Sequence, residues 1–319
     1  MYYIGVDGGG SKTTSILTDL QGNVIRTARH GPGNIAVLDR GSIAQLIRRV
    51  INDLLQGENI EQVRWTTFAF AGAGRSKEKE IAGEIIKGAG IKHFNIMTDA
   101  EILYYSIFGD EAGILISAGT GSICLIKDEN NQFQQIGGWG YLLGDEGGGF
   151  DIGHQAIRKA INEMDIGEPP SLLTKELLSF YGLQRVDELI SITYSSHNPQ
   201  RLVASCAKLV CDLAEKGEPN AEAIVDSAAT ALLNLAMKAL EHPHFGPQTR
   251  IALVGSILQE PSIVNQKFRE KAREIGMNFN YIPQQLEPAV AAVLYAIKKS
   301  GETVSQSLLQ KLKKVTFTH

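Results

Sequence analysis

The chain has 319 residues, of which 43% are hydrophobic and 21% are charged. This composition is typical of a globular protein, and the length is sufficient for two domains with separate cores. The formal net charge is −4 and the sequence has no block of basic residues. These features argue against nucleic acid as a partner and against electrostatic attachment to a membrane.

Secreted and membrane-spanning classes, and metal sites built from cysteines, also find little support in the sequence. The first residues, MYYIGVDGGG, lack the basic start and apolar stretch of a signal peptide. Apolar runs such as residues 228–233 are too short to span a bilayer. The three cysteines, Cys124, Cys206 and Cys211, have no metal-ligand spacing and are predicted to be free thiols. We therefore expect a cytoplasmic protein.

Strand-like and helix-like segments alternate in the first half of the chain. Apolar, β-branched runs predict strands, and apolar residues at helical spacing predict helices. The predicted strands cover residues 2–6, 13–19, 24–29, 65–70 and 94–97, and the predicted helices cover residues 43–55 and 77–87. This order predicts an α/β domain with a mixed sheet covered by helices.

The second half begins on the same plan. Strands are predicted at residues 113–117, 122–126 and 133–136. A strand, a glycine-rich turn and a second strand therefore recur about 110 residues after their first occurrence, which indicates two domains of similar architecture. Helical patterns fill residues 150–240, including segments at 171–181, 201–216 and 221–240, before a strand at 250–254 and a helix at 288–299.

The predicted domain boundaries follow from this pattern. The first domain covers residues 1–107, and a larger domain with a helical insertion covers residues 108–300. Residues 301–319 form a short amphipathic tail, which we expect to pack back on a domain, with the N-terminal domain as the first candidate.

The first candidate site follows the first predicted strand. Residues 7–12 read DGGGSK. Consecutive glycines allow the backbone to approach a ligand and to direct several N–H groups at an anion. Ser11 and Lys12 add a hydroxyl and a cation, and Asp7 is placed to hold a hydrated Mg²⁺. The spacing is not that of a Walker A loop. The alternative is a hairpin whose glycines only satisfy the turn.

Two further glycine turns follow strands in the second half. Residues 117–122, SAGTGS, could present the hydroxyls of Thr120 and Ser122 to a second part of a polyphosphate. Gly255 and Ser256 could allow a base or a ribose to lie against bare backbone. Each turn alone could be purely structural. Two phosphate loops on two similar halves together predict a nucleotide in the cleft between them.

Asp99 follows the strand at residues 94–97. An Asp at this position is a good helix N-cap, but a carboxylate at the end of a strand could also accept a proton from a substrate hydroxyl. We take Asp99 as the candidate general base.

Candidate sugar ligands come from two loops. Residues 137–149 contain seven glycines, one Trp and an acid pair, a composition that suits a sugar. The alternative makes Trp139 a core anchor and uses Asp145 and Glu146 to cap the following helix. Asn34, in a loop after a strand, could bind a sugar hydroxyl or only stabilise a turn.

Taken in chain order, these motifs resemble a known family. The sequence is similar to the N-acetylglucosamine kinase branch of the BadF/BadG/BcrA/BcrD ATPase family, within the actin, heat-shock chaperone and sugar kinase superfamily. The resemblance covers about residues 2–299 and is most specific before residue 150. The family often has threonine where this chain has Ser11, a change that keeps the hydroxyl. The resemblance rests on residues 7–12, Asn34, 98–100, 117–122, 138–140, 144–147, Gly255 and Ser256.

The resemblance implies two ribonuclease-H-like domains around a central cleft that binds ATP, Mg²⁺ and a sugar. Asp99 would take the proton from the sugar 6-hydroxyl as its oxygen attacks the γ-phosphorus, and Asp7 would assist Mg²⁺. The nucleotide would contact Asp7, Gly9, Gly10, Ser11, Lys12, Gly119, Thr120, Gly121, Gly255 and Ser256. The amino sugar would contact Asn34, Gly138, Trp139, Gly140 and Asp145.

Several alternatives stay open. The substrate could be N-acetylglucosamine, glucosamine or N-acetylmuramic acid. Some members of the wider family are ATPases that activate a CoA-thioester dehydratase through an iron–sulfur cluster, but the three cysteines here fall on predicted strands and helices. A sugar-sensing regulator would need a DNA-binding segment with a basic face, and none is evident in the sequence. A homodimer is the default assembly on symmetry grounds.

Overall fold

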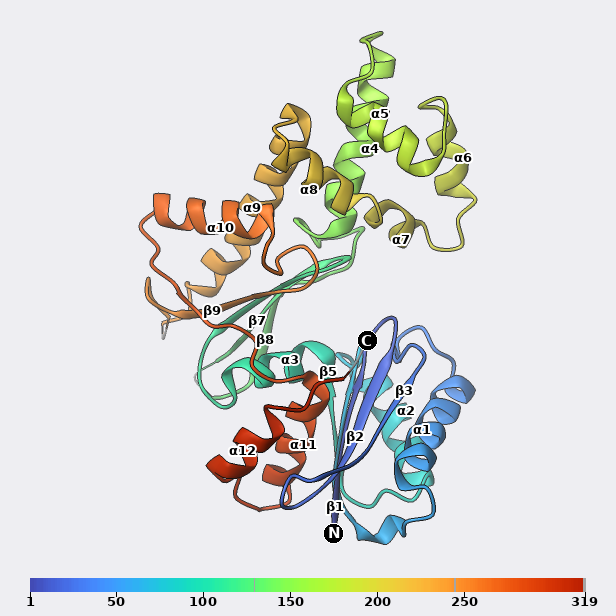
Figure 1. The fold of residues 1–319 in the computed structure, drawn as a ribbon, viewed down its shortest axis with the longest axis vertical. Helices are drawn as coiled ribbons and strands as arrows, with labels where there is room; N and C mark the ends of the chain where they lie inside the picture. The colour runs from blue at the N-terminus through green and yellow to red at the C-terminus, as the bar shows by residue number, and fades with distance from the viewer. Residues whose placement is uncertain (129, 244, 318–319) are drawn as a thin grey trace. The chain divides into compact units, whose positions relative to one another are not determined.

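The computed structural model describes residues 1–128, 130–243 and 245–317, shown in Figure 1. The chain forms two compact units. Unit 1 contains Met1–Asp110 and Gln284–His319, and unit 2 contains Glu111–Pro283. Each unit is built on one five-stranded sheet.

The sheet of unit 1 has the strand order β3-β2-β1-β4-β5. The first three strands form an antiparallel meander, and β4 and β5 continue the sheet in parallel with β1. The strands are β1 (Tyr2–Gly8), β2 (Thr13–Asp19), β3 (Val24–His30), β4 (Val63–Phe70) and β5 (Phe94–Thr98). All five strands predicted in this half are present.

Helices cover both faces of this sheet (Figure 1). Ile4 and Val6 of β1 join the apolar core beneath α1 and α2. Because side chains alternate across a strand, Gly5 and Asp7 lie on the opposite face, where α3 and α11 pack. The helices of unit 1 are α1 (Arg40–Leu55), α2 (Ser76–Gly88), α3 (Asp99–Phe108), α11 (Pro288–Lys299) and α12 (Gln306–Leu312), with a short 3-10 helix η1 (Ile60–Gln62).

The sheet of unit 2 has the same plan as that of unit 1. Its order is β10-β9-β6-β7-β8, so β6, β7 and β8 form the meander and β9 and β10 are parallel to β6. The strands are β6 (Ile114–Ala118), β7 (Ser122–Lys127), β8 (Phe133–Gly137), β9 (Arg250–Val254) and β10 (Asn280–Tyr281). The expected two domains of similar architecture are confirmed.

Most helices of unit 2 lie between β8 and β9 in sequence. Helix α9 packs on β6, β7 and β8. Helices α4, α8 and α10 pack in turn on α9. The helices are α4 (Gly149–Asp165), α5 (Leu172–Tyr181), α6 (Glu188–Tyr194), α7 (Pro199–Ala204), α8 (Ala207–Glu215), α9 (Pro219–Ala239) and α10 (Ile263–Glu274).

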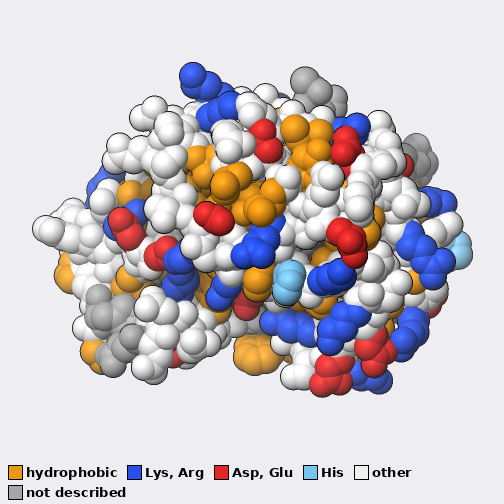
Figure 2. Space-filling view, turned by 90° about the horizontal axis from the view of Figure 1, so that it is seen from below, with side chains coloured by type: hydrophobic (Ala, Val, Ile, Leu, Met, Phe, Trp, Pro, Cys, Tyr) orange, Lys and Arg blue, Asp and Glu red, His pale blue; other side chains and the backbone are white. Residues whose placement is uncertain are grey.

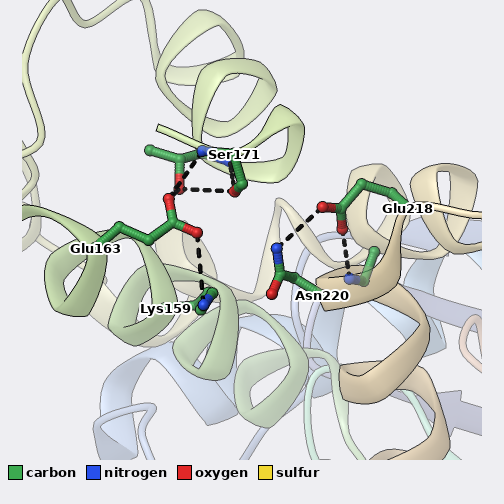
Figure 3. Close-up of polar contacts among 7 residues, drawn as sticks. Lys159, Glu163, Ser171, Glu218 and Asn220 are labelled. Atoms are coloured by element: carbon green, nitrogen blue, oxygen red, sulfur yellow. Dashed lines mark hydrogen bonds and ion pairs between the residues drawn. The ribbon is translucent and has the colours of Figure 1, made fainter. Parts of the chain in front are cut away.

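A buried carboxylate joins two helices of this insertion (Figure 3). Glu163, near the end of α4, accepts hydrogen bonds from the Ser171 N–H at 3.0 Å and from the Thr174 hydroxyl at 2.7 Å. Lys159 lies 3.7 Å from the same carboxylate. Burial raises the pKa of Glu163, but these donors and the Lys159 charge outweigh that effect and lower it. Glu163 therefore stabilises the fold as a carboxylate.

Two expectations about the chain differ from the structure. Helix α11 belongs to unit 1, whereas the expected boundary at residue 300 put it in the second domain. The predicted helix at 201–216 is two helices, α7 and α8, separated at Ser205 and Cys206. Gly153 of α4 packs against the Val203 carbonyl at this break, a close approach that apolar periodicity does not reveal.

The tail after α11 contacts unit 1. Leu308 and Leu312 of α12 are buried, and Leu308 packs against Gly22 in the turn between β2 and β3. The Arg29 guanidinium of β3 donates a hydrogen bond to the Phe317 carbonyl at 3.1 Å.

Acidic and basic side chains are interspersed on the face shown in Figure 2. In the described part of the chain, no helix combines the length and the apolar character needed to cross a membrane.

Candidate active site

Three loops of unit 1 meet at the end of β1. The Gly9 N–H donates a hydrogen bond to the Lys12 carbonyl at 2.9 Å, which closes the turn between β1 and β2. The Gly33 N–H donates to the Gly9 carbonyl at 2.8 Å, and the Ala71 N–H donates to the Gly8 carbonyl at 2.8 Å. A Cβ on Gly33 would lie 2.6 Å from the Gly8 Cα, so glycine is needed where these backbones touch.

The outer part of the first loop is open. Gly10, Ser11 and Lys12 are exposed, and a Cβ on Gly10 would meet no atom within 4 Å. Packing within unit 1 therefore does not explain the glycine at position 10. A backbone that must approach a ligand closely does explain it.

Asn34 lies beside this loop. Its Oδ1 accepts a hydrogen bond from the Ala36 N–H at 3.1 Å, so the carbonyl oxygen of the side chain stabilises a turn. Gly72, with φ of +77°, packs against the same oxygen. The Asn34 Nδ2 group is the part of this side chain that suits a sugar oxygen.

The sheet register brings Asp7 and Asp99 to one edge of unit 1. Gly8 of β1 pairs with Phe70 of β4, and Phe70 pairs with Thr98 of β5, so the three parallel strands end level with one another. Asp7 precedes the last residue of β1, and Asp99 follows the last residue of β5. Negative charge at Asp99 contributes to raising the pKa of Asp7, so the two carboxylates interact electrostatically.

Asp99 is not the N-cap of α3, which corrects the structural alternative for this residue. Thr98 is the cap: its hydroxyl accepts from the Glu101 N–H at 3.0 Å, and the Glu101 carboxylate accepts from the Thr98 N–H at 2.8 Å. Asp99 occupies the first turn, where its Oδ1 accepts from the Ala100 N–H at 3.0 Å. The pKa of Asp99 is raised above its usual value, because burial outweighs the backbone N–H donors that lower it. The capping box therefore does not use the Asp99 carboxylate, whose Oδ2 has no hydrogen bond among the described residues.

Glu287, at the start of α11, is a further acid at this edge that the sequence analysis did not identify. Burial is the main cause that raises the pKa of Asp7 to about 7, and Asp99 and Glu287 raise it further while Lys12 lowers it. Glu287 occupies the N-cap position of α11 but accepts no capping hydrogen bond through its side chain. More than 270 residues separate Glu287 from Asp7 in the chain, so no local pattern could have linked them.

In unit 2, the loop between β6 and β7 is supported by the start of α4. The Gly149 N–H donates to the Gly119 carbonyl at 2.7 Å, and the Phe150 N–H donates to the Thr120 carbonyl at 2.9 Å. The Thr120 side chain is exposed. Ser122 is buried and its hydroxyl donates to the Glu146 carbonyl at 2.7 Å, so the expected ligand role of that hydroxyl is wrong.

The turn at Gly255 lies against the same loop. Gly255 has φ of +93°, and a Cβ there would overlap the Ala118 carbonyl, so only glycine fits. A pocket of about 300 Å³ brings Gly119, Thr120 and Ser256 together. Helix α8 supplies pocket residues that the sequence analysis missed, among them Lys208, Cys211 and Asp212.

The glycine-rich loop after β8 presents Trp139 to solvent. Trp139 is 68% exposed, so its alternative role as a core anchor is wrong. Gly138 and Gly140, with φ of +69° and +89°, adopt backbone conformations that favour glycine. The loop therefore holds a large aromatic side chain on the surface of unit 2.

Asp145 is buried in this loop and contacts both neighbouring motifs. Its Oδ1 accepts a hydrogen bond from the Gly140 N–H at 3.1 Å, and a Cβ on Gly121 would overlap its other oxygen. The N-cap of α4 is Gly148, with no side-chain capping bond, so the alternative that Asp145 caps this helix is also wrong. The pKa of Asp145 is raised above its usual value, because burial outweighs the hydrogen bond from the Gly140 N–H, which lowers it.

The three cysteines of unit 2 are free thiols. Cys124 and Cys206 are fully buried, and Cys211 is partly buried on α8. Among the described residues, no group of three or more His, Cys, Asp and Glu side chains is arranged to hold a metal ion.

The fold and the loops define a class of protein. It has two α/β units whose sheets share one topology, and each unit has a glycine turn after the first strand of its sheet. The model of the BadF/BadG/BcrA/BcrD ATPase family matches residues 4–296, so the chain belongs to this family.

Similar proteins include two curated kinases. The chain is 29% identical over 309 residues to the N-acetylmuramic acid/N-acetylglucosamine kinase of Clostridium acetobutylicum, an alignment that covers 92% of this chain and 98% of that protein. It is 27% identical over 318 residues to the N-acetyl-D-glucosamine kinase of Dictyostelium discoideum, covering 92% and 97%.

Solved structures confirm the fold class. A candidate N-acetylglucosamine kinase from Chromobacterium violaceum gives a TM-score of 0.72 at 24% identity and covers 92% of this chain and 98% of that chain. A ROK family glucokinase from Streptomyces griseus gives a TM-score of 0.52 at 16% identity, covering 93% and 100%. The two-domain ribonuclease-H-like fold predicted from the sequence is therefore confirmed.

Proposed function

We propose that this protein is an ATP-dependent kinase that phosphorylates the 6-hydroxyl of an amino sugar, with N-acetylglucosamine as its substrate. Family membership and the names of the two curated relatives support this proposal. The observation that carries it is the edge of unit 1, where Asp7 and Asp99 end parallel strands beside an open glycine loop.

In the proposed reaction, Asp99 acts as the general base. A general base must reach the proton that it removes and must be ionised to accept it. The Thr98 cap fixes the start of α3, and the Ala100 N–H holds one carboxylate oxygen of Asp99, which leaves the other oxygen for the sugar hydroxyl. The Asp99 carboxylate takes the proton of the sugar 6-hydroxyl as the oxygen attacks the γ-phosphorus, and ADP leaves.

The amino sugar is proposed to bind Asn34 in unit 1 and the glycine-rich loop of unit 2. Aromatic faces suit sugar rings, and the exposed Trp139 offers one. The Gly138 and Gly140 backbone and the buried Asp145 carboxylate would supply hydrogen bonds to hydroxyl groups.

ATP is proposed to contact both units. In unit 1, the loop of Gly9, Gly10, Ser11 and Lys12 offers backbone N–H groups, a hydroxyl and a cation to phosphate oxygens. In unit 2, Gly119, Thr120 and Gly121 would contact phosphate, and Gly255 and Ser256 would lie near the adenosine. The pocket that Thr120 and Ser256 share supports this division of roles.

The residues at the Asp7 edge fit a Mg²⁺ ion. They offer carboxylate oxygens, the ligands that Mg²⁺ prefers, and burial beside other acids raises the pKa of Asp7 to about 7, so a cation bound there would favour its ionised form. An ion that arrives with ATP phosphates needs only one or two protein carboxylates, so the lack of a larger cluster in the described chain agrees with Asp7 as its protein ligand. When bound, Mg²⁺ neutralises phosphate charge.

The test is a coupled ADP-release assay on N-acetylglucosamine, glucosamine, N-acetylmuramic acid and glucose, with a no-sugar control. We expect Asp99→Asn to lower kcat by about 10²–10⁴ while sugar binding persists, the range for a lost general base. Glu80→Gln, at an exposed acid of α2, is the matched control and should keep full activity. Near-full activity in Asp99→Asn would remove the residue from its role, and ADP release independent of every sugar would overturn the proposal.

A further inference from the structure

The pocket of unit 2 is lined on one side by helix α8. Besides Thr120 and Ser256, its wall includes Lys208, Cys211 and Asp212. These three side chains come from one face of α8, because residues three and four apart lie on the same side of a helix. Helix α8 therefore presents a charged pair and a thiol to the place proposed for the nucleotide.

Asp212 lies further along α8 than the part of the helix that touches the proposed phosphate loop. A Cβ on Gly149 would be 3.0 Å from the Gly119 carbonyl and 3.6 Å from the Cβ of Ala207, the first residue of α8. Asp212 follows Ala207 by five residues, which is about 7.5 Å along a helix that rises about 1.5 Å per residue. A nucleotide that extends along α8 from its phosphates therefore brings its ribose to Asp212.

The Asp212 carboxylate is oriented by Lys208. The Lys208 Nζ donates to Asp212 Oδ1 at 2.8 Å and to Asp212 Oδ2 at 2.7 Å. Each carboxylate oxygen can accept more than one hydrogen bond, and the Asp212 side chain is 44% exposed, so both oxygens keep acceptor capacity. An exposed ion pair contributes little to stability. The pair therefore holds an oriented acceptor in the pocket with little consequence for the fold.

The ribose of a nucleotide matches this acceptor in chemistry. It offers two neighbouring hydroxyl donors, whereas a carboxylate offers two acceptor oxygens and no donor. Dinucleotide-binding folds use the same chemistry when an Asp or a Glu accepts a hydrogen bond from the ribose 2′-hydroxyl. Hydrogen bonds to an ionised acceptor are also stronger than those between neutral groups.

We propose that Asp212 binds the 2′- and 3′-hydroxyls of the ATP ribose, so that this kinase selects nucleotides that carry these hydroxyls over nucleotides that lack them. The inference deepens the proposed function and rests on it, because it assumes that ATP occupies the pocket of unit 2. Asp212 acts in nucleotide specificity and takes no part in the transfer itself.

The experiment measures the binding of ADP and of 2′,3′-dideoxy-ADP to the full-length protein by isothermal titration calorimetry with Mg²⁺ present. Wild type should bind ADP at least about tenfold more tightly, as for hydrogen bonds to a charged group. In Asp212→Ala the two affinities should lie within about twofold of each other, because the ribose hydroxyls have lost their acceptor. The two nucleotides have identical phosphates, so Lys208 without its partner acts equally on both, and the ratio of affinities reports only the ribose.

Two further variants separate recognition of the ribose from general charge. Asp212→Asn keeps one acceptor oxygen but loses the charge, so it should show an intermediate preference for ADP. Glu176→Gln removes an exposed acid of α5 outside the pocket and should keep the wild-type preference. The melting temperature of each variant should lie within about 2 °C of wild type, since the Lys208–Asp212 pair is exposed.

Each outcome decides the question. Equal affinities of wild type for the two nucleotides, or a preference for ADP that survives in Asp212→Ala, would overturn the inference and leave the proposed function intact. The same loss of preference in Glu176→Gln would also overturn it. If wild type binds ADP with this preference but phosphorylates no amino sugar in the ADP-release assay, the proposed function fails and the ribose assignment stands. If wild type binds neither nucleotide, both fail.

Discussion

Gly5 is the position where the backbone of α11 touches the sheet of unit 1. A Cβ on Gly5 would overlap the Ala289 carbonyl and lie 2.7 Å from the Val293 N and 2.9 Å from the Val293 Cγ2. Two of these three atoms belong to the backbone, so no side-chain rotation can relieve the overlap. Gly5→Ala must therefore displace α11 from β1.

The expected loss in the free energy of unfolding of Gly5→Ala follows from the destabilisation typical of small-to-large substitutions in packed cores. Inserted methyl groups cost typically 1–3 kcal/mol, and we expect about 3 kcal/mol here because rigid backbone must move. For a unit of this size each kcal/mol lowers Tm by roughly 2–4 °C, so Tm should fall by about 6–12 °C. Because α11 begins beside Asp7, kcat should also fall at temperatures where the variant is still folded.

Thermal unfolding followed by circular dichroism measures this prediction, together with kcat at 20 °C. Gly88→Ala, at the end of α2, is the matched control, because a Cβ there meets no atom within 4 Å. That control should be neutral or stabilising by up to about 1 kcal/mol. A Gly5→Ala variant that melts within about 2 °C of wild type would refute the described packing of α11.

The remaining predictions concern unit 2. Gly121→Ala should destabilise the protein by about 1–3 kcal/mol in urea unfolding and raise KM for the sugar, because its Cβ would overlap the Asp145 carboxylate. Thr120→Ala should raise KM for ATP about tenfold in the ADP-release assay. Glu163 has a lowered pKa in the fold, so its contribution to the free energy of unfolding is present above about pH 4.5 and is lost as pH falls further. Glu163→Gln should be less stable than wild type at pH 7, by about 1–3 kcal/mol, and the difference should shrink by pH 3.

Each of these three predictions can be contradicted by a specific result. Gly119→Ala is the control for the stability of Gly121→Ala, since the nearest atom to its Cβ is 4.0 Å away. Equal losses of stability in urea unfolding would show that the Asp145 contact is unimportant. A Thr120→Ala effect confined to sugar affinity would contradict the phosphate role. A stability difference for Glu163→Gln that does not change with pH would rule out the buried carboxylate as the source of the pH dependence.

Local sequence patterns were sufficient to predict most of the strands and the shared topology of the two sheets. The apolar strand of residues 13–19 and the strand of residues 250–254 have the predicted bounds, because short β-branched runs between glycine turns leave few alternatives. The repeated strand–turn–strand order also predicted that both sheets share one plan. This topology is set by the order of elements, which the sequence displays directly.

The site was less accessible to sequence reasoning, for reasons of geometry. Asp99 reads as an N-cap because Asp is a good cap, yet Thr98 and Glu101 form a capping box one residue earlier. The break at Ser205 lies within a continuous amphipathic pattern, so periodicity predicted one helix. The residues of α8 that line the unit 2 pocket meet Gly119, Thr120 and Ser256 only through the tertiary fold, so no local pattern could identify them.

Helix α11 shows why domain membership is the hardest of these properties to predict. Eight of its residues are buried, from Ala289 to Ile297, so it has no polar face to mark an orientation. Its contact with β1 depends on Gly5, since only a strand without a side chain there admits a helix backbone so closely. The two partners are at opposite ends of the chain, and no local pattern connects them. This same contact holds Glu287 beside Asp7, so the proposed catalytic edge depends on residues from both ends of the sequence.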